Sequence, residues 1–509
     1  MTEANQTSAL PDNAAGAAAA LAAGQPALVW RKAIADCDTP VGAARRLIEP
    51  GRGDFLLESV EGGEVRGRYS LLGLDPDLVF RGSEGSAEIN REWQHDVTAF
   101  QPCEGDALAE LRSLAAACRI DVPDALPPAL ACLVGYFGYE TIGLVETLPR
   151  AEPSELALPD LLFVRPTIIL VFDGLSDELF CIAPIWNADD PAAAIERAGE
   201  RIDETLRTLS QRRPAEPRLA GQVAEPELTP VLDGNDYKSL VARAKDYILA
   251  GDIFQVVLAQ RFTCPFELPP LALYRALRRV NPSPFLYFLD LPGFAIVGSS
   301  PEILVRVRDG EVTIRPIAGT RPRGSTSAED SDNEASLLAD PKERAEHLML
   351  LDLGRNDVGR VAARGSVEVT DSFTIERYSH VMHIVSNVVG ELASGRDALD
   401  ALFAGFPAGT VSGAPKIRAC EIIAELEPET RGAYAGGVGY FAPDGSVDSC
   451  IVLRTAVVKD GTMHVQAGAG IVADSDPDYE LAECKAKAGA LIAAAREAVR
   501  VASEPGYGQ

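Results

Sequence analysis

Residues 212–230 interrupt the regular patterns of this chain, because they carry four prolines and show little periodicity. Clustered prolines end helices and central strands, so such a segment is typical of a linker between folded units. Short apolar runs bounded by turn residues precede it, and helical and strand-like patterns alternate after it. We therefore expect one domain at 28–211, a linker at 212–230 and a second domain at 231–500.

The apolar runs predict a mixed α and β protein with a substantial core, since 47% of the 509 residues are hydrophobic. In the first domain we expect strands at 54–57, 69–74, 130–137 and 161–172 and a helix at 191–209. In the second domain we expect a helix at 236–251 and strands at 254–262, 294–297 and 311–316.

Residues 1–27 are rich in alanine but lack the features of a secretory signal. No Lys or Arg precedes Arg31, and Glu3 is acidic. We expect these residues to form a flexible extension. The nine cysteines include no CxxC pair, which favours reduced thiols and a cytoplasmic location.

The formal net charge of −28 argues against nucleic acid and anionic membrane surfaces as partners, because no basic surplus is left to neutralise phosphates. No run approaches the roughly 20 apolar residues that cross a bilayer. An anionic substrate would need a local cation in such an acidic protein.

Two predicted helices begin with an N-cap aspartate followed by proline, at 340–341 and 476–477. Each carries two glutamates whose three-residue spacing places both carboxylates on one face: Glu343 with Glu346, and Glu480 with Glu483. These side chains can simply stabilise the helix starts, and Glu343 can close a capping box. Alternatively they bind Mg²⁺, which accepts one or two protein carboxylates. Glu346 and Glu483 would then be direct ligands, supported by Glu343 and Glu480.

Four segments form a signature in a characteristic order: RPIAGTRPRG (315–324), DPKERAEHLMLLDLGRNDVGRV (340–361), FPAGTVSGAPKIRA (406–419) and QAGAGIVADSDPDYELAECKAKA (466–488). From about residue 237 to 488 the chain closely resembles the chorismate-utilising enzymes. The resemblance implies a large antiparallel β-sandwich-like α/β fold with surrounding helices and an active site in a cleft of the second domain. A phosphate loop is a weaker alternative, because GTVSGAPK lacks that motif's register.

The resemblance also implies the catalytic groups. It makes Glu302 in SSPEIL the general acid that protonates the leaving 4-hydroxyl, which requires burial to raise its pKa toward neutrality. His383 in YSHVMHIVS matches the catalytic histidine and would relay a proton as pyruvate leaves. Thr410 is the third catalytic residue that the resemblance implies. Without the motif, a lone histidine on an apolar strand is more often structural.

Chorismate has two carboxylates, so its binding site needs positive charge. The resemblance assigns the ring carboxylate to Mg²⁺ and the enolpyruvyl side chain to Arg454, whose guanidinium makes two-pronged carboxylate contacts. The substrate-binding residues that it implies are Gly319, Thr320, Tyr434, Arg454, the GAG turn of Gly468, Ala469 and Gly470, and Lys487.

Two positions distinguish the nucleophile within this family. The water-adding members carry a lysine where this chain has Gln255, and the aminodeoxychorismate synthases typically carry a lysine where it has Ala318. Both differences favour ammonia addition, which is the reaction of the anthranilate synthases of tryptophan biosynthesis. Aminodeoxychorismate synthase, of the folate pathway, stays as the alternative. A non-catalytic amino-acid-binding regulator is disfavoured because all four carboxylates are present.

The chain shows no glutaminase signature, which would combine a cysteine in a G-x-C-x-G elbow with a downstream histidine and glutamate. The resemblance therefore implies a separate glutamine amidotransferase subunit as the partner that supplies ammonia.

Two distant segments, LLES at 56–59 and NPSPFL at 281–286, resemble the tryptophan-binding elements of anthranilate synthases. They predict feedback inhibition by tryptophan at a site between the two domains. Glu58 would bind the ligand's ammonium and Ser59 its polar atoms. The remaining residues of the expected inhibitor site are Pro284, Phe285, Leu286, Val438 and Tyr440. Each segment also has an ordinary interpretation, as a strand end and as a proline turn.

Overall fold

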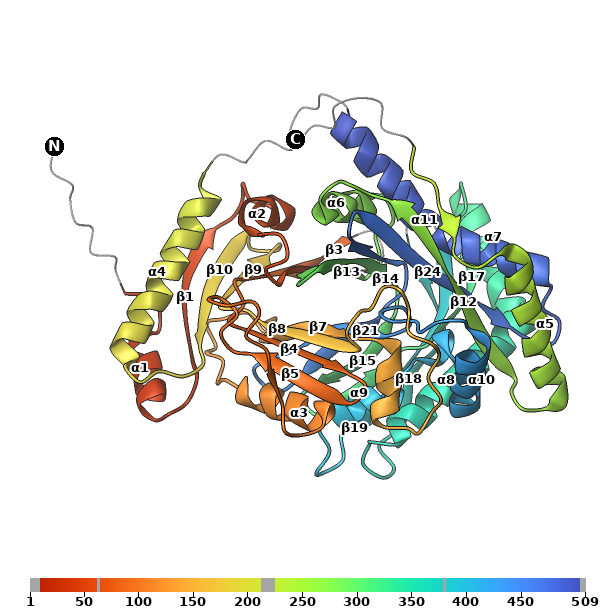
Figure 1. The fold of residues 1–509 in the computed structure, drawn as a ribbon, viewed down its shortest axis with the longest axis horizontal. Helices are drawn as coiled ribbons and strands as arrows, with labels where there is room; N and C mark the ends of the chain where they lie inside the picture. The colour runs from red at the N-terminus through yellow and green to blue at the C-terminus, as the bar shows by residue number, and fades with distance from the viewer. Residues whose placement is uncertain (1–9, 62–64, 212–224, 379–380, 504–509) are drawn as a thin grey trace.

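The computed structural model describes residues 10–61, 65–211, 225–378 and 381–503. Residues 1–9 of the expected extension and 212–224 of the expected linker lie outside these ranges. The described residues form one β-sandwich with helices outside it (Figure 1).

Two 12-stranded sheets with antiparallel strand pairs make up the sandwich. Sheet A follows the order β1 (Ala27–Ile34), β10 (Glu178–Ile185), β9 (Ile168–Asp173), β3 (Val65–Leu74), β2 (Asp54–Glu61), β13 (Phe285–Leu291), β14 (Phe294–Ser300), β23 (Thr455–Lys459), β24 (Thr462–Ile471), β12 (Gln255–Pro265) and β11 (Thr229–Pro230), with β20 (Gly413–Ala414) on β12. Sheet B follows the order β17 (Ile317–Pro322), β19 (Val381–Glu391), β16 (Glu311–Ile314), β15 (Ile303–Arg308), β22 (Val447–Ile451), β21 (Gly437–Phe441), β7 (Leu133–Phe137), β8 (Leu161–Arg165), β4 (Leu78–Ser83), β5 (Ser86–Asn90) and β6 (Gln101–Pro102), with β18 (Glu368–Arg377) on β19.

Helices pack against both sheets (Figure 1). Sheet A contacts α1 (Ala14–Ala22), α2 (Pro40–Leu47), α4 (Pro191–Leu209), α5 (Gly234–Ala250), α6 (Pro270–Val280), α10 (Lys416–Leu426) and α11 (Pro477–Ser503). Sheet B contacts α3 (Ala107–Ala117), α7 (Ser327–Ala339), α8 (Pro341–Gly359) and α9 (Ala398–Gly405). The predicted sandwich-like fold with surrounding helices is confirmed.

The two faces of each strand serve different cores, because successive side chains of a strand point to opposite sides. In β3, Leu71 packs in the core between the sheets, whereas Leu72 belongs to the core that includes the helices. The helices bury one face of each sheet and the opposite sheet buries the other.

Both sheets combine strands from before and after residues 212–230. In sheet A, Phe285 of β13 pairs with Ser59 of β2, and in sheet B, Gly437 of β21 pairs with Phe137 of β7. The expected domains at 28–211 and 231–500 therefore share their sheets and cores. A local composition change cannot reveal this, because pairing between distant strands leaves no local pattern.

The expected flexible extension is structured in its second part. Residues 14–22 form α1, in which Ala17 and Leu21 are buried against α4 and β1. The expected strand at 161–172 is in fact two strands. Pro166 lacks the N–H that a continuous ladder needs, and the chain passes there from β8 in sheet B to β9 in sheet A.

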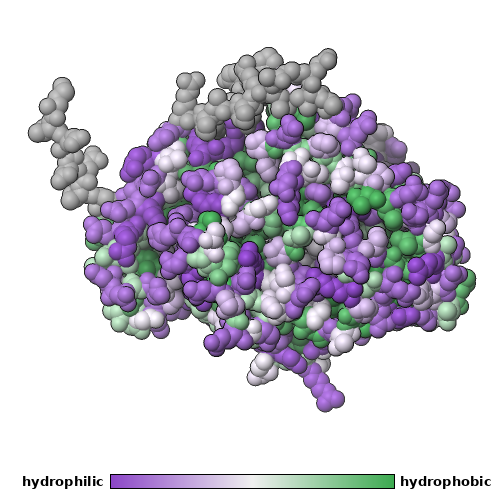
Figure 2. Space-filling view, in the orientation of Figure 1, coloured by the Kyte–Doolittle hydropathy of each residue, from purple (hydrophilic) through white to green (hydrophobic). Residues whose placement is uncertain are grey.

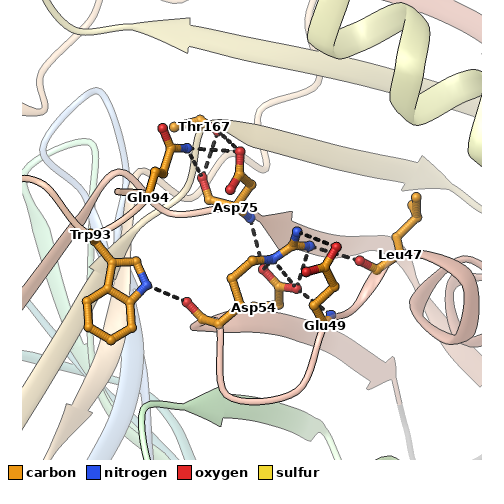
Figure 3. Close-up of polar contacts among 8 residues, drawn as sticks. Leu47, Glu49, Asp54, Asp75, Trp93, Gln94 and Thr167 are labelled. Atoms are coloured by element: carbon orange, nitrogen blue, oxygen red, sulfur yellow. Dashed lines mark hydrogen bonds and ion pairs between the residues drawn. The ribbon is translucent and has the colours of Figure 1, made fainter. Parts of the chain in front are cut away.

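A buried ion pair fixes the start of β2 (Figure 3). The Asp54 carboxylate is fully buried and accepts hydrogen bonds from Arg52 and from the backbone N–H groups of Glu49 and Asp75. The indole of Trp93 donates to the Arg52 carbonyl at 2.7 Å. This cluster ties three loops together at the end of sheet A.

Polar side chains cover much of the face seen in Figure 2, with hydrophobic side chains in scattered patches. Among the described residues, no helix combines the length and apolarity needed to cross a bilayer.

Candidate active site

Glu302 lies between β14 and β15, and only 6% of its surface is exposed. Burial raises the pKa of its carboxyl to about 8, against smaller lowering effects from Thr410 and the Ile317 backbone. The carboxyl is therefore protonated at pH 7 and can donate a proton. Thr410 lies in the turn η2 (Gly409–Val411), and its buried hydroxyl makes no well-formed hydrogen bond within the described residues.

His383 lies on β19 with 7% of its surface exposed. Its Nδ1 is 2.8 Å from the Gly319 carbonyl oxygen and 3.2 Å from the Thr320 hydroxyl. A carbonyl only accepts, so this contact assigns the proton to Nδ1 and leaves the lone pair on Nε2. Burial lowers the pKa of His383 to about 4, and Arg454 also acts to lower it. The ring is neutral at pH 7 and can accept a proton at Nε2.

Arg454 follows β22 and has a left-handed φ of 48°, which is uncommon for a residue other than glycine. It is half-buried, and no carboxylate pairs with its guanidinium in the described ranges. It interacts electrostatically with both His383 and Tyr378. Such a cation is suited to bind an anionic group of a ligand.

The GAG residues lie in a strand and not in the turn that the sequence suggested. Gly468, Ala469 and Gly470 belong to β24 and pair with 257–259 of β12. A Cβ added at Gly468 would lie 2.8 Å from the Tyr434 hydroxyl oxygen, and one at Gly470 would lie 2.4 Å from Nε2 of Gln255. Only glycine allows these two side chains to approach the strand so closely.

The four glutamates of the predicted metal site lie on α8 and α11, whose N-caps are Asp340 and Asp476 as expected. Glu343 forms an ion pair with Arg321 at 3.1 Å, and no capping box is formed there. Glu483 forms an ion pair with Lys487 at 2.7 Å.

The carboxylates of the two helices influence one another. Burial raises the pKa of Glu346, and the charges of Glu343 and Glu483 raise it further. Burial likewise raises the pKa of Glu480, with a further raising effect from Glu483. The described residues contain no group of three or more His, Cys, Asp or Glu side chains close enough to hold a metal ion by themselves. Mg²⁺ that takes one or two carboxylates and completes its shell with water and substrate is compatible with this arrangement.

Two contacts join the glutamates to the other predicted site residues. The Gly319 carbonyl accepts a hydrogen bond from Nδ1 of His383. Gly319 has a φ of +68°, and a Cβ added to this residue would lie 3.1 Å from a Glu343 carboxylate oxygen. Lys487 donates to the carbonyl of Gly468 at 2.9 Å. The structure thus brings the predicted catalytic, substrate-binding and metal residues into one neighbourhood.

Tyr378, which lies within the same motif as His383, is a further residue of this site that the sequence did not predict. Its ring centroid is 5.5 Å from that of His383, and its hydroxyl donates to Glu376 at 2.8 Å. Burial raises the pKa of Tyr378, and Glu376 and Glu302 raise it further. The missed signal was an aromatic residue just before the predicted catalytic strand.

The two segments of the predicted inhibitor site are neighbours. Ser59 of β2 lies opposite Phe285 of β13, and Glu58 lies opposite Leu286. Successive side chains of a strand point to opposite faces, so the predicted inhibitor-binding side chains lie on both faces of sheet A. Phe285 packs with the core between the sheets, as do Val438 and Tyr440, whereas Leu286 packs in the core that includes the helices. Pro284 is half-buried just before β13.

Glu58 has partners of its own on α6. Its carboxylate is 7% exposed and accepts hydrogen bonds from the Tyr274 hydroxyl at 2.6 Å and from Arg278 at 2.7 and 2.9 Å. A ligand's ammonium would share the carboxylate with these α6 residues, so the predicted role of Glu58 stays a prediction. The sequence could not show that α6 covers this face of β2.

Comparison with known proteins identifies the family. The model of the chorismate binding enzyme family matches residues 55–493. The anthranilate synthase component 1 of Cereibacter sphaeroides is 55% identical, over 96% of this chain and 98% of its own length. That of Thermus thermophilus is 47% identical, over 91% of this chain and 96% of its own.

Solved structures agree. The anthranilate synthase component I from Streptococcus pneumoniae is 35% identical, with a TM-score of 0.75, covering 84% of this chain and 92% of that chain. The menaquinone-specific isochorismate synthase from Escherichia coli, at 19% identity, shows the same fold with a TM-score of 0.69, covering 96% of each chain. The family match over most of the chain and the nearly end-to-end similarity of these relatives show that the chain belongs to the chorismate binding enzyme family.

Proposed function

We propose that this chain converts chorismate and ammonia into anthranilate, pyruvate and water, in the cytoplasm, as the first committed step of tryptophan biosynthesis. The observation that carries the proposal is that a buried, protonated Glu302 and a buried, neutral His383 both lie near Tyr378. The similarity to anthranilate synthase component 1 chains supports the same reaction.

The chemistry has two stages. Ammonia adds to the ring as the 4-hydroxyl leaves, and Glu302 gives its proton to that oxygen so that it departs as water. The ring then loses a proton as the enolpyruvyl C–O bond breaks, which yields pyruvate and the aromatic product. His383 relays this proton at Nε2, because its Nδ1 is held by the Gly319 carbonyl.

Substrate binding needs positive charge at both ends of chorismate. Arg454 would bind the enolpyruvyl carboxylate, beside Tyr434 and the strand of Gly468. Glu346 and Glu483, supported by Glu343 and Glu480, would hold Mg²⁺. Burial raises the pKa of Glu346 most, and a bound cation would relieve the added repulsion from Glu343 and Glu483. Bound Mg²⁺ would neutralise and orient the ring carboxylate.

The residue types at two positions favour anthranilate over the other family products. Gln255 stands where water-adding members carry lysine, and its amide packs on Gly470. Ala318 is buried on β17, where no side-chain nucleophile is available. Aminodeoxychorismate synthase stays the second candidate, because it would use the same substrate and metal residues.

We also propose that ammonia comes from a glutamine amidotransferase partner, anthranilate synthase component II, and that tryptophan inhibits the enzyme. The second proposal is supported by the adjacency of Ser59 and Phe285, on the face of sheet A that also meets Val438 and Tyr440. Glu58 would bind the inhibitor's ammonium while its carboxylate also accepts from Tyr274 and Arg278.

The purified chain tests this function directly. With chorismate, Mg²⁺ and an ammonium salt it should produce the blue fluorescence of anthranilate, and with glutamine in place of ammonium it should produce none. Accumulation of aminodeoxychorismate would favour the second candidate. Glutamine-dependent activity of the purified chain alone would contradict the proposed need for a partner.

A further inference from the structure

A fully buried ion pair lies beside the proposed active site and has no role in the chemistry described so far. Arg431 is 2% exposed and Glu427, four residues earlier, is 5% exposed. The guanidinium donates to both carboxylate oxygens, at 2.8 Å from Nε and 2.6 Å from Nη2. A buried pair is weak evidence for a stabilising role, because desolvation of the charges offsets much of their attraction.

The two side chains of this pair bond backbone groups at the edge of β12, in the position that a neighbouring strand would take. Beyond the short β20, the Val257 carbonyl accepts from Arg431 Nη2 at 2.7 Å, and the Ala259 N–H donates to Glu427 at 2.8 Å. On its other edge, β12 pairs 257 with Gly470 and 259 with Gly468. The ion pair therefore holds the part of β12 that lies directly opposite the two glycines.

Arg431 also contacts two further parts of the proposed site. Its Nη1 donates to the Val411 carbonyl at 2.7 Å, next to Thr410 in the turn η2. Its guanidinium lies 5.6 Å from the ring of Tyr434, whose hydroxyl lies against Gly468. One side chain thus connects the Thr410 turn, Tyr434 and the strand opposite the glycines.

The same residue is anchored to the first half of the chain. The Tyr139 ring lies 4.7 Å from the guanidinium. The Glu140 carboxylate accepts from the backbone N–H groups of Arg431 and Gly432, at 2.7 and 3.0 Å. Tyr139, Glu140 and Arg431 also line a cavity of about 360 Å³. The anchor leaves Arg431 little freedom to move.

We propose that Arg431 is a positioning residue for this reaction, with Glu427 as its counter-charge. It acts by fixing Thr410 beside the general acid Glu302 and by fixing Tyr434 against the substrate-binding strand. The proposal rests on the proposed function. Small displacements of groups around reacting atoms can lower turnover on the order of a hundredfold.

The test is the double variant Arg431→Met with Glu427→Leu, because replacing both members of a buried pair with apolar residues of similar size usually preserves folding. The Val411 and Val257 carbonyls and the Ala259 N–H lose their partners in this variant, so we expect a lower melting temperature but a folded chain at the assay temperature. Its turnover should fall on the order of a hundredfold even at saturating chorismate, so the loss is a loss of kcat. Arg431→Lys keeps the positive charge but cannot make the two-pronged contact. Its kcat should lie between those of the double variant and the unmodified chain.

The matched control is Arg165→Met with Asp77→Leu. This pair has the same two-pronged geometry, at 2.8 Å for both contacts, and also stacks on an aromatic ring, that of Trp186. The control should keep normal kcat. A folded Arg431/Glu427 double variant with normal kcat overturns the proposal, as does an equal loss in both double variants.

Failure of the proposed function is distinguishable, because the unmodified chain would then make no anthranilate. In that case chorismate binding, measured by calorimetry in the presence of Mg²⁺, takes the place of kcat. Weaker binding by the double variant but not by the control supports the positioning role, and equal binding by all three proteins overturns it.

Discussion

At the scale of single residues, burial decides the protonation of the two proposed proton-transfer groups. Glu302 is driven toward its neutral acid and His383 toward its neutral base, so both are ready for their roles at pH 7. The sequence motif pointed to these residues, but their protonation states depend on burial that only the fold creates, which outweighs the opposing effects of Thr410 on Glu302 and of Gly319 on His383.

Glu302→Gln keeps the shape of the side chain and removes the proton donor. We expect turnover with chorismate and ammonium to fall by about 10²–10⁴, with little change in chorismate binding. Steady-state kinetics combined with calorimetric titration would measure the two effects. Turnover within a few fold of that of the unmodified chain would show that Glu302 is not the general acid.

The same substitution predicts a change in the pH dependence of stability. Because the folded-state pKa is about 8 and the ordinary value is 4.5, the stabilising contribution of Glu302 is full below 4.5 and is lost as the pH rises toward 8. Glu302→Gln lacks this loss. Relative to the unmodified chain, its free energy of unfolding in urea should therefore increase between about pH 5 and pH 8. A pH-independent difference contradicts the raised pKa.

At the scale of elements, local patterns predicted individual helices and strands well. The capped starts of α8 and α11 and the strands β2 and β12 lie where the sequence placed them, because caps and apolar runs are local signals. The course of 161–172 across two sheets and the cover of α6 over Glu58 depend on tertiary packing. Sequence periodicity does not contain that information.

The electrostatic interaction of Glu346 on α8 with Glu483 on α11 predicts magnesium dependence. Glu346→Gln and Glu483→Gln each remove one charged oxygen, so Mg²⁺ should no longer raise the melting temperature and turnover should collapse. Glu497→Gln is the matched control, since this residue lies on α11 but pairs with Arg279 and Arg500. Thermal shift across a Mg²⁺ titration provides a readout apart from activity. Near-normal activity of either variant at limiting Mg²⁺ would contradict the ligand assignment.

The adjacency of β2 and β13 predicts the site of tryptophan control. Ser59→Phe should fill the space beside Phe285, leave uninhibited turnover roughly intact and abolish inhibition by tryptophan. Ser83→Phe, at the exposed end of β4, should keep the inhibition. Inhibition curves with tryptophan test both variants. If the unmodified chain neither binds tryptophan nor loses activity with it, the proposed regulatory site does not exist.

At the scale of the whole molecule, the two halves of the chain depend on each other. Expressed alone, residues 1–211 and 231–509 would each expose strand edges that the intact chain pairs, at β2 with β13 and β7 with β21. We expect each fragment to aggregate or to lack a cooperative unfolding transition, and co-expression to restore a folded complex. Circular dichroism during urea titration measures this. Two independently folding fragments would contradict it.

The central claim is that the chain joins ammonia to the ring of chorismate and releases pyruvate. The most direct test supplies the purified chain with chorismate, Mg²⁺ and ¹⁵N-ammonium and identifies the products by mass spectrometry. We predict anthranilate that carries the heavy nitrogen, together with an equal amount of pyruvate. Isochorismate as the product, or aminodeoxychorismate that accumulates without pyruvate, would contradict the claim.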